Sequence, residues 1–142
     1  MGFMIQAHAN SSAFNHGGLI KGKVTETCYH EPCSVAKIES YRALNKGYSE
    51  TKLEVTLLGG SRNWKEKKVS WNRVPHKVIV NCSYTRPTIQ SGSQKTLIPL
   101  NDEWGVHGVL MTSAELYLYA CHNFSGDMTK AINRYGYNVY DE

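Results

Sequence analysis

Four cysteines are the residues whose spacing indicates chemistry most directly. Two lie close together in Cys28-Tyr-His-Glu-Pro-Cys33, and two lie far apart at Cys82 and Cys121. None belongs to a C-x-x-C motif, the spacing of zinc ribbons and thioredoxin-like sites, so an even-numbered set of disulfides is the favoured interpretation. We therefore predict one bridge from Cys28 to Cys33 and another from Cys82 to Cys121.

Zinc is the alternative for these cysteines, because thiolates and imidazoles are its preferred ligands and His30 and His122 lie nearby in the sequence. The separation of Cys28 from Cys33 is long for a zinc knuckle, and Cys82 has no close neighbour of ligand type. The sequence thus favours disulfides and indicates neither a metal nor another cofactor.

No catalytic motif accompanies the histidines. Cys121 and His122 invite comparison with a nucleophile and its base, but adjacent residues point to opposite faces of a strand and diverge by about 100° on a helix. Nothing like G-x-S-x-G or H-E-x-x-H surrounds the histidines, so we predict no catalytic residues. A small secreted hydrolase or effector using His107 or His122 is the least favoured function.

Two segments are candidate contact surfaces. In Glu103–Gly108, glycines flank Val106-His107 and would expose Trp104 and His107 in a ligand-gripping loop, unless Trp104 pins the loop over the core. In Ser61–Arg73, basic residues interleave with aromatic residues, a combination that holds anionic polymers or sugars by charge and stacking. The basic residues of this second segment are Arg62, Lys65, Lys67, Lys68 and Arg73, and its aromatic residues are Trp64 and Trp71. The alternative is a solvated hairpin whose Trp71 faces the core.

Disulfides and the N-terminus indicate a compartment outside the cytosol, periplasmic or secreted. Ala7-His8-Ala9 has the small-x-small form of a signal-peptidase site, and Met4-Ile5 could be the remainder of an apolar region. Residues 1–18 are expected to be a leader or signal remnant that lies outside the core, and residues 19–142 a single secreted domain.

Charge and hydropathy exclude some partners. The net charge of +4 comes from bases that are spread along the chain, so nucleic acid is not expected as a partner. Such a balance attracts anionic polysaccharide or an acidic protein weakly and in a salt-dependent way. No stretch approaches the 18 or more apolar residues of a membrane span.

Short runs rich in Val, Ile, Thr and Tyr predict the strands that must position these residues. Residues 21–29 and 34–42 form a hairpin around the first cysteine pair. Residues 51–58 alternate in polarity and end at Gly59-Gly60, and residues 77–85 form an interior strand with Cys82 in the core. Residues 67–74 and 95–100 supply further short strands.

The C-terminal third holds one ambiguous segment. Thr112-Ser-Ala-Glu115 fits a capping box, which starts a helix, whereas Glu115–Cys121 alternates Tyr with Leu and is dense in Tyr. We favour a strand here, because a bridge between strands or sheets from Cys121 to Cys82 then follows directly. Residues 125–136 predict a helix with Ser125 or Asp127 as N-cap and Gly136 as C-cap.

Together these features predict a β-rich α+β protein: an antiparallel sheet or small sandwich with a C-terminal helix, stabilised by disulfides. The function expected first is a non-enzymatic binding protein, such as a bacterial inhibitor or immunity-type protein that blocks a partner enzyme or toxin. The second is a module that binds carbohydrate or an anionic polymer.

Overall fold

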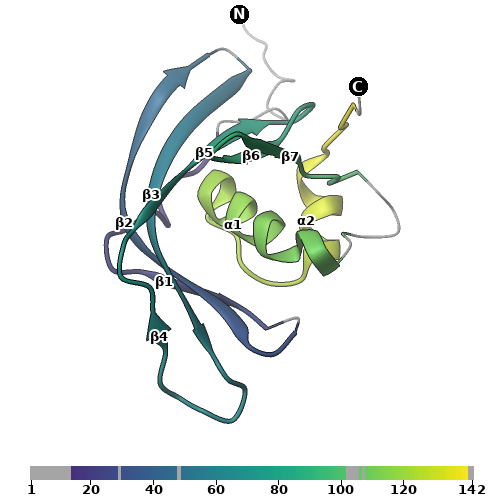
Figure 1. Ribbon diagram of the computed structural model, residues 1–142. Helices are drawn as coiled ribbons and strands as arrows, with labels where there is room; N and C mark the ends of the chain where they lie inside the picture. Colours follow the sequence, from purple (N-terminus) through teal and green to yellow (C-terminus); the bar gives the residue numbers. More distant parts are fainter. Residues whose placement is uncertain (1–13, 29, 48, 102–105, 107, 141–142) are drawn as a thin grey trace, which may run out of the picture.

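The protein folds as one antiparallel sheet followed by two helices, in the computed structural model shown in Figure 1. The structure describes residues 14–28, 30–47, 49–101, 106 and 108–140. The strands are β1 (Val24–Thr27), β2 (Cys33–Lys46), β3 (Glu50–Arg62), β4 (Ser70–Trp71), β5 (His76–Ser83), β6 (Thr88–Ser91) and β7 (Gln94–Leu97). A single 3-10 turn at Gly108–Leu110 leads into α1 (Met111–His122), and α2 (Met128–Tyr135) follows. The β-rich α+β prediction is confirmed, with two C-terminal helices in place of one.

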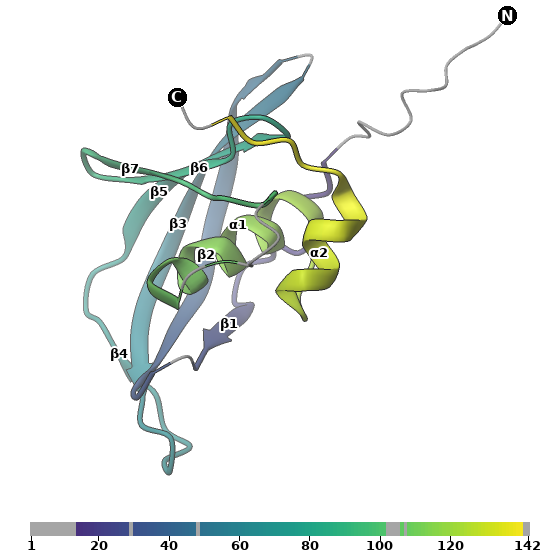
Figure 2. The ribbon, with the colours of Figure 1, turned by 90° about the vertical axis from the view of Figure 1, so that its right-hand side faces the viewer.

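The sheet has the strand order β1-β2-β3-β5-β6-β7, and the two-residue β4 pairs with the far end of β3. β2 and β3 form its longest hairpin, whose register shifts after Ile38 and again after Ala43. Such irregularities bend a strand and increase its twist. The sheet consequently curves around α1, which lies on its concave face with α2 beside it (Figures 1 and 2).

Alternate residues of the central strands build the core against α1. Leu53, Val55 and Leu57 of β3 are buried, as are Val78, Val80 and Cys82 of β5. The alternation predicted for both strands is confirmed, because one face packs on the helix and the other faces outward.

Residues 115–121 are helical, so the strand prediction for Glu115–Cys121 is wrong. α1 is buried almost all round its second half, where residues 117–122 are all buried between the sheet, α2 and the N-terminal segment. A helix buried on every side has no polar face, and its sequence then carries no 3.6-residue period. The predicted capping box does not form either, because the N-cap is Leu110 and Glu115 instead bonds Thr27 of β1.

Both predicted disulfides form, and they join different kinds of element. Cys28 and Cys33 close the β1–β2 turn, as expected, with their Cα atoms 4.2 Å apart. Cys82 and Cys121 join β5 to α1 across 5.7 Å, so this bridge links a strand to a helix and not two strands. Such bridges suit an oxidising compartment outside the cytosol. Within the described residues, neither α-helix has the length and apolarity to span a membrane.

Other strand boundaries also differ from the prediction. β3 continues through Gly59-Gly60 to Arg62, because Gly60 gives the backbone of β4 room to approach: a Cβ there would lie 2.7 Å from the carbonyl oxygen of Ser70. The strand predicted over 67–74 shrinks to β4, and β6 was not predicted. α2 begins and ends as expected, with Asp127 as its N-cap and Gly136 as its C-cap.

The segment before β1 packs on the core, which corrects the exclusion of residues 14–18 from it. Phe14 stacks on Tyr84 with ring centroids 4.9 Å apart, and the amide of Asn15 donates to the carbonyl of Cys121 at 2.7 Å. His16 bonds the carbonyl of Ala120 through Nδ1 at 2.8 Å. The segment is hydrophilic and has no period, so only its tertiary partners reveal that it is ordered.

Candidate functional site: a braced loop beside the first disulfide

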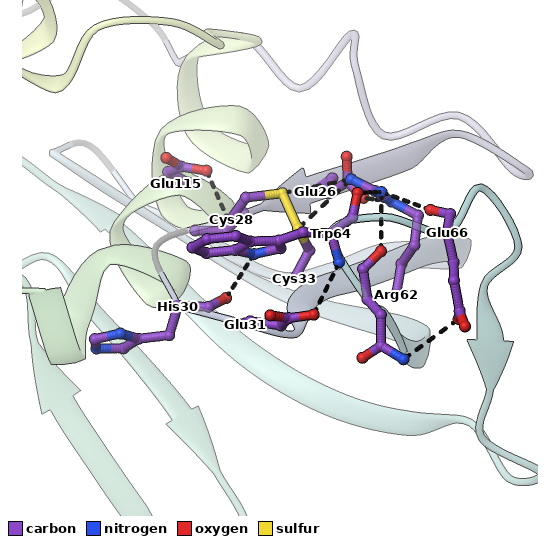
Figure 3. Close-up of a disulfide and its surroundings, with 11 residues drawn as sticks. Glu26, Cys28, His30, Glu31, Cys33, Arg62, Trp64, Glu66 and Glu115 are labelled. Carbon is purple, nitrogen blue, oxygen red and sulfur yellow. Dashed lines mark hydrogen bonds and ion pairs between the residues drawn. A yellow bond between two sulfur atoms is a disulfide. The ribbon is translucent and has the colours of Figure 1, made fainter.

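The loop between β3 and β4, residues 62–69, projects from one end of the sheet (Figures 1 and 2). We call it the braced loop. It begins as the backbone leaves β3 at Arg62 and ends where Ser70 pairs with Ser61. The disulfide-closed turn between β1 and β2 lies against its base (Figure 3).

The side chain of Arg62 holds the loop in shape from within. Its Nη1 donates to three carbonyl oxygens of the loop: to Asn63 at 3.3 Å, to Trp64 at 3.4 Å and to Glu66 at 2.8 Å. Its Nε donates to Oε2 of Glu26 on β1 at 2.6 Å. This carboxylate raises the pKa of Arg62 further above its already high ordinary value. Bonds from a charged donor are among the stronger hydrogen bonds of proteins, so the guanidinium fixes the loop's backbone to the sheet.

Trp64 anchors the loop to the disulfide-closed turn. Its backbone amide donates to Oε2 of Glu31 at 3.3 Å, and its indole Nε1 donates to the carbonyl of His30 at 3.3 Å. The Nη2 atom of Arg62 lies 3.5 Å from the Sγ of Cys33. Figure 3 shows the indole beside the Cys28–Cys33 bridge. Trp64 nevertheless remains 54% exposed, so these bonds fix its position without covering it.

The lysines of the loop are exposed and unpaired. Lys65, Lys67 and Lys68 make no ion pair or hydrogen bond through their side chains with any residue that the structure describes. Glu66, the only acid among them, accepts a bond from Nδ2 of Asn63 at 3.3 Å. A fixed backbone therefore presents one tryptophan and three positive charges to solvent.

The remaining predicted site residues lie elsewhere or support this loop. Trp71 is half-buried, with Nζ of Lys37 4.8 Å from its ring centroid. It packs over Gly60 on the outer face of the sheet, so it neither faces the core nor offers a free stacking surface. Arg73 is exposed just after β4. Trp104 and His107 lie outside the described residues, and their loop stays a prediction.

The geometry fits neither free or metal-bound thiols nor a catalytic His122. All four cysteines are bonded in disulfides. Within the described residues, the one cluster of ligand-type side chains is Glu26, Cys28 and Cys33, and both of its sulfur atoms belong to the first disulfide. His122 bonds the hydroxyl of Tyr137 at 2.8 Å in the core. Burial, together with the positive charges of His16 and Arg134, lowers the pKa of His122 to about 4. It is a neutral core residue at pH 7.

Sequence reasoning found the exposed residues of this site but missed what holds them. Glu26, Glu31 and the carbonyl of His30 are far from the loop in sequence, and nothing in their local pattern marks them as its partners. Arg62 was grouped with the contact bases, whereas its guanidinium is committed to the loop and to Glu26.

The comparisons with known proteins assign no family. No protein-family model matches the chain, and no curated protein or solved structure is significantly similar to it.

Proposed function

We propose that the chain is a non-enzymatic binding protein of the periplasm or the extracellular space, and that it holds a partner protein through the braced loop. One observation carries this proposal: the Arg62 guanidinium fixes three carbonyls of the loop, leaving Trp64 and its lysines exposed. A loop already fixed in one conformation loses little entropy on binding, which raises affinity. Tryptophan is enriched among the residues that dominate binding energy at interfaces.

The partner's surface is expected to be acidic and concave. An acidic surface is expected because the positive charges of Lys65, Lys67 and Lys68 are not neutralised, and opposite charge on the partner speeds the encounter of the two proteins. A concave surface is expected because the loop projects beyond the sheet in both views of the fold (Figures 1 and 2). An enzyme cleft has this form, and insertion of the loop would block it, as an inhibitor or immunity-type protein does.

The alternative ligand, an anionic polysaccharide, is less well supported. Binding of a polymer uses several aromatic platforms along a groove. Of the two tryptophans that the structure describes, only Trp64 is free, since Trp71 is covered by Lys37. The proposal is therefore a protein partner, and a carbohydrate adduct is an outcome of the test.

The test places a photo-crosslinking amino acid at position 67 and exposes the protein to an extracytoplasmic extract of its source organism. We expect a protein adduct that protease digests and that mass spectrometry identifies. The matched control carries the crosslinker at Lys95, an exposed lysine of β7. The same adduct from both positions, or an adduct that yields no peptides besides those of this chain, would contradict a protein partner at this loop.

The purified partner then permits a charge test. Replacing Lys65, Lys67 and Lys68 by Ala should weaken binding roughly 10- to 100-fold and flatten its salt dependence, with Tm nearly unchanged. Replacing Lys21, Lys46 and Lys95 removes the same charge elsewhere and should alter affinity by no more than about threefold. If the two triple variants weaken binding equally, the lysines of the loop contribute only through the net charge of the protein.

A further inference from the structure

A second feature of the molecule, separate from the braced loop, is a hollow on the concave face of the sheet below the first turns of α1. It has a volume of about 350 Å3 and is lined by residues of β1, β2, β3, β5, β6 and α1. This volume lies within the range of sites that hold small organic ligands.

The hollow exists because the core side chains become small at this level of the sheet. Ile38 and Leu57 pair across β2 and β3 and fill the space under α1. Two residues along each strand, the paired inward positions are Ala36 and Gly59, and Thr25 continues the row on β1. The row of small residues leaves open the space that a leucine and an isoleucine occupy in the next row.

Gly59 also lets two polar side chains lie over the strand. A Cβ at this position would lie 3.1 Å from Nδ2 of Asn72 and 3.7 Å from Cε1 of His76. Both residues line the hollow, so their polar groups reach the space that the missing side chain leaves. Ligand sites typically combine a mostly apolar lining with a few polar groups that orient the occupant, and Asn72 and His76 supply such groups here.

Among the described residues that line the hollow, Glu115 is the only acidic one. Its Oε1 accepts a hydrogen bond from Oγ1 of Thr27 at 2.7 Å, which fixes the carboxylate between α1 and β1 (Figure 3). Its Oε2 has no hydrogen-bond or ion-pair partner within the described part of the chain. Glu115 is half-buried and also lines a neighbouring cavity of about 440 Å3, so a ligand can reach it.

We propose that this hollow binds a small organic ammonium ion. The ammonium would donate to the free oxygen of Glu115, and the apolar body of the ligand would pack on Leu57, Val78 and Ile89, which also line the hollow. An ionised acceptor makes hydrogen bonds roughly twice as strong as a neutral one, so charge should dominate selectivity among ligands of one shape.

The test uses three probes that share a chain and differ in head group: hexylammonium, 1-hexanol and hexanoate. Each is titrated at pH 7 into isotopically labelled protein, and amide chemical shifts of residues 25, 36 and 59 report binding. We expect hexylammonium to bind at least about tenfold more tightly than the other two. Absence of saturable shifts with hexylammonium, or equal affinity for all three probes, overturns the proposal.

Variants locate the site and isolate the charge. Glu115→Gln keeps an acceptor for Thr27 but removes the charge, and should bring hexylammonium to within about threefold of 1-hexanol. Glu39→Gln, on β2 outside both cavities, is the matched control and should change nothing. Ala36→Leu should fill the hollow and weaken every probe. A tenfold preference that persists in Glu115→Gln overturns the proposal even if Ala36→Leu fails to fold.

Discussion

At the scale of single residues, Arg62 shows how one side chain can shape an exposed loop. Its planar fork donates to three carbonyls of the loop and to Glu26 at once. Lysine could not replace it, because an ammonium is a point donor without this fixed geometry.

Loss of the Arg62 fork should open the loop. In Arg62→Gln we expect cleavage by a lysine-specific endoprotease at residues 65–68 to rise roughly tenfold, because local opening controls access to the backbone. Arg42→Gln removes an exposed ion pair with Glu54 and serves as control. If the two variants are cut at the same rate, Arg62 does not hold the loop.

His122 should make the fold sensitive to mild acid. Its pKa of about 4 lies below the unfolded value of about 6.5, so the unfolded chain binds this proton first as the pH falls. The contribution of neutral His122 to the free energy of unfolding is therefore fully present above pH 6.5 and is lost as the pH falls towards 4. The loss should be on the order of 2 kcal/mol in the free energy of unfolding.

Chemical denaturation at pH 7, 5.5 and 4 measures this effect. His122→Gln keeps a polar partner for Tyr137 and should be less stable at pH 7, yet show a shallower decline between pH 7 and pH 4. A decline as steep as that of the wild type would assign the acid sensitivity to other groups.

At the scale of elements, the sequence predicts strands whose two faces differ and fails where an element is buried all round. The alternation of Leu53, Val55 and Leu57 with polar residues predicts β3, because the other face of this strand is directed to solvent. In α1, residues 117–122 contact protein on every side, so the alternation of Tyr and Leu there does not indicate a strand. The cysteine pairing was predictable although one element was wrong, because Cys28 and Cys33 are close enough in sequence to pair locally, which leaves Cys82 for Cys121.

The two disulfides should differ in their contribution to stability. In the chain-entropy account, the bridge from β5 to α1 closes a long loop and contributes about 4 kcal/mol, whereas the bridge of the β1–β2 turn contributes about 2 kcal/mol. Urea unfolding of Cys82→Ala/Cys121→Ala and Cys28→Ala/Cys33→Ala should show this order. The reverse order would mean that closing the β1–β2 turn contributes more to the free energy of unfolding than attaching α1 to the sheet.

At the scale of the whole molecule, the N-terminal segment belongs to the folded unit. Phe14 stacks on Tyr84 and lies 5.5 Å from the ring of His122, and the hydroxyl of Tyr119 donates to the carbonyl of Gly18. No local pattern predicts this, because residues 14–18 gain order from contacts with α1, with Tyr41 of β2 and with the segment that follows β5.

Shortened chains test the extent of the folded unit. Relative to a chain beginning at residue 14, one beginning at residue 19 should lose about 2–3 kcal/mol, from one half-buried aromatic ring and its neighbouring hydrogen bonds. Thermal and urea unfolding of both chains measure the difference. Equal stabilities would return the domain boundary to residue 19.

The positions of the two described ends bear on how the protein can be held. Phe14 stacks on Tyr84, and the amide of Tyr140 donates to the carbonyl of Thr85, so both ends lie just beyond the last residue of β5. The braced loop lies near the first residue of β5, at the opposite pole of the molecule (Figures 1 and 2). A tether at either end, whether a sensor chip, a neighbouring domain or a lipid, would therefore point Trp64 and its lysines away from the support and toward whatever approaches from solution.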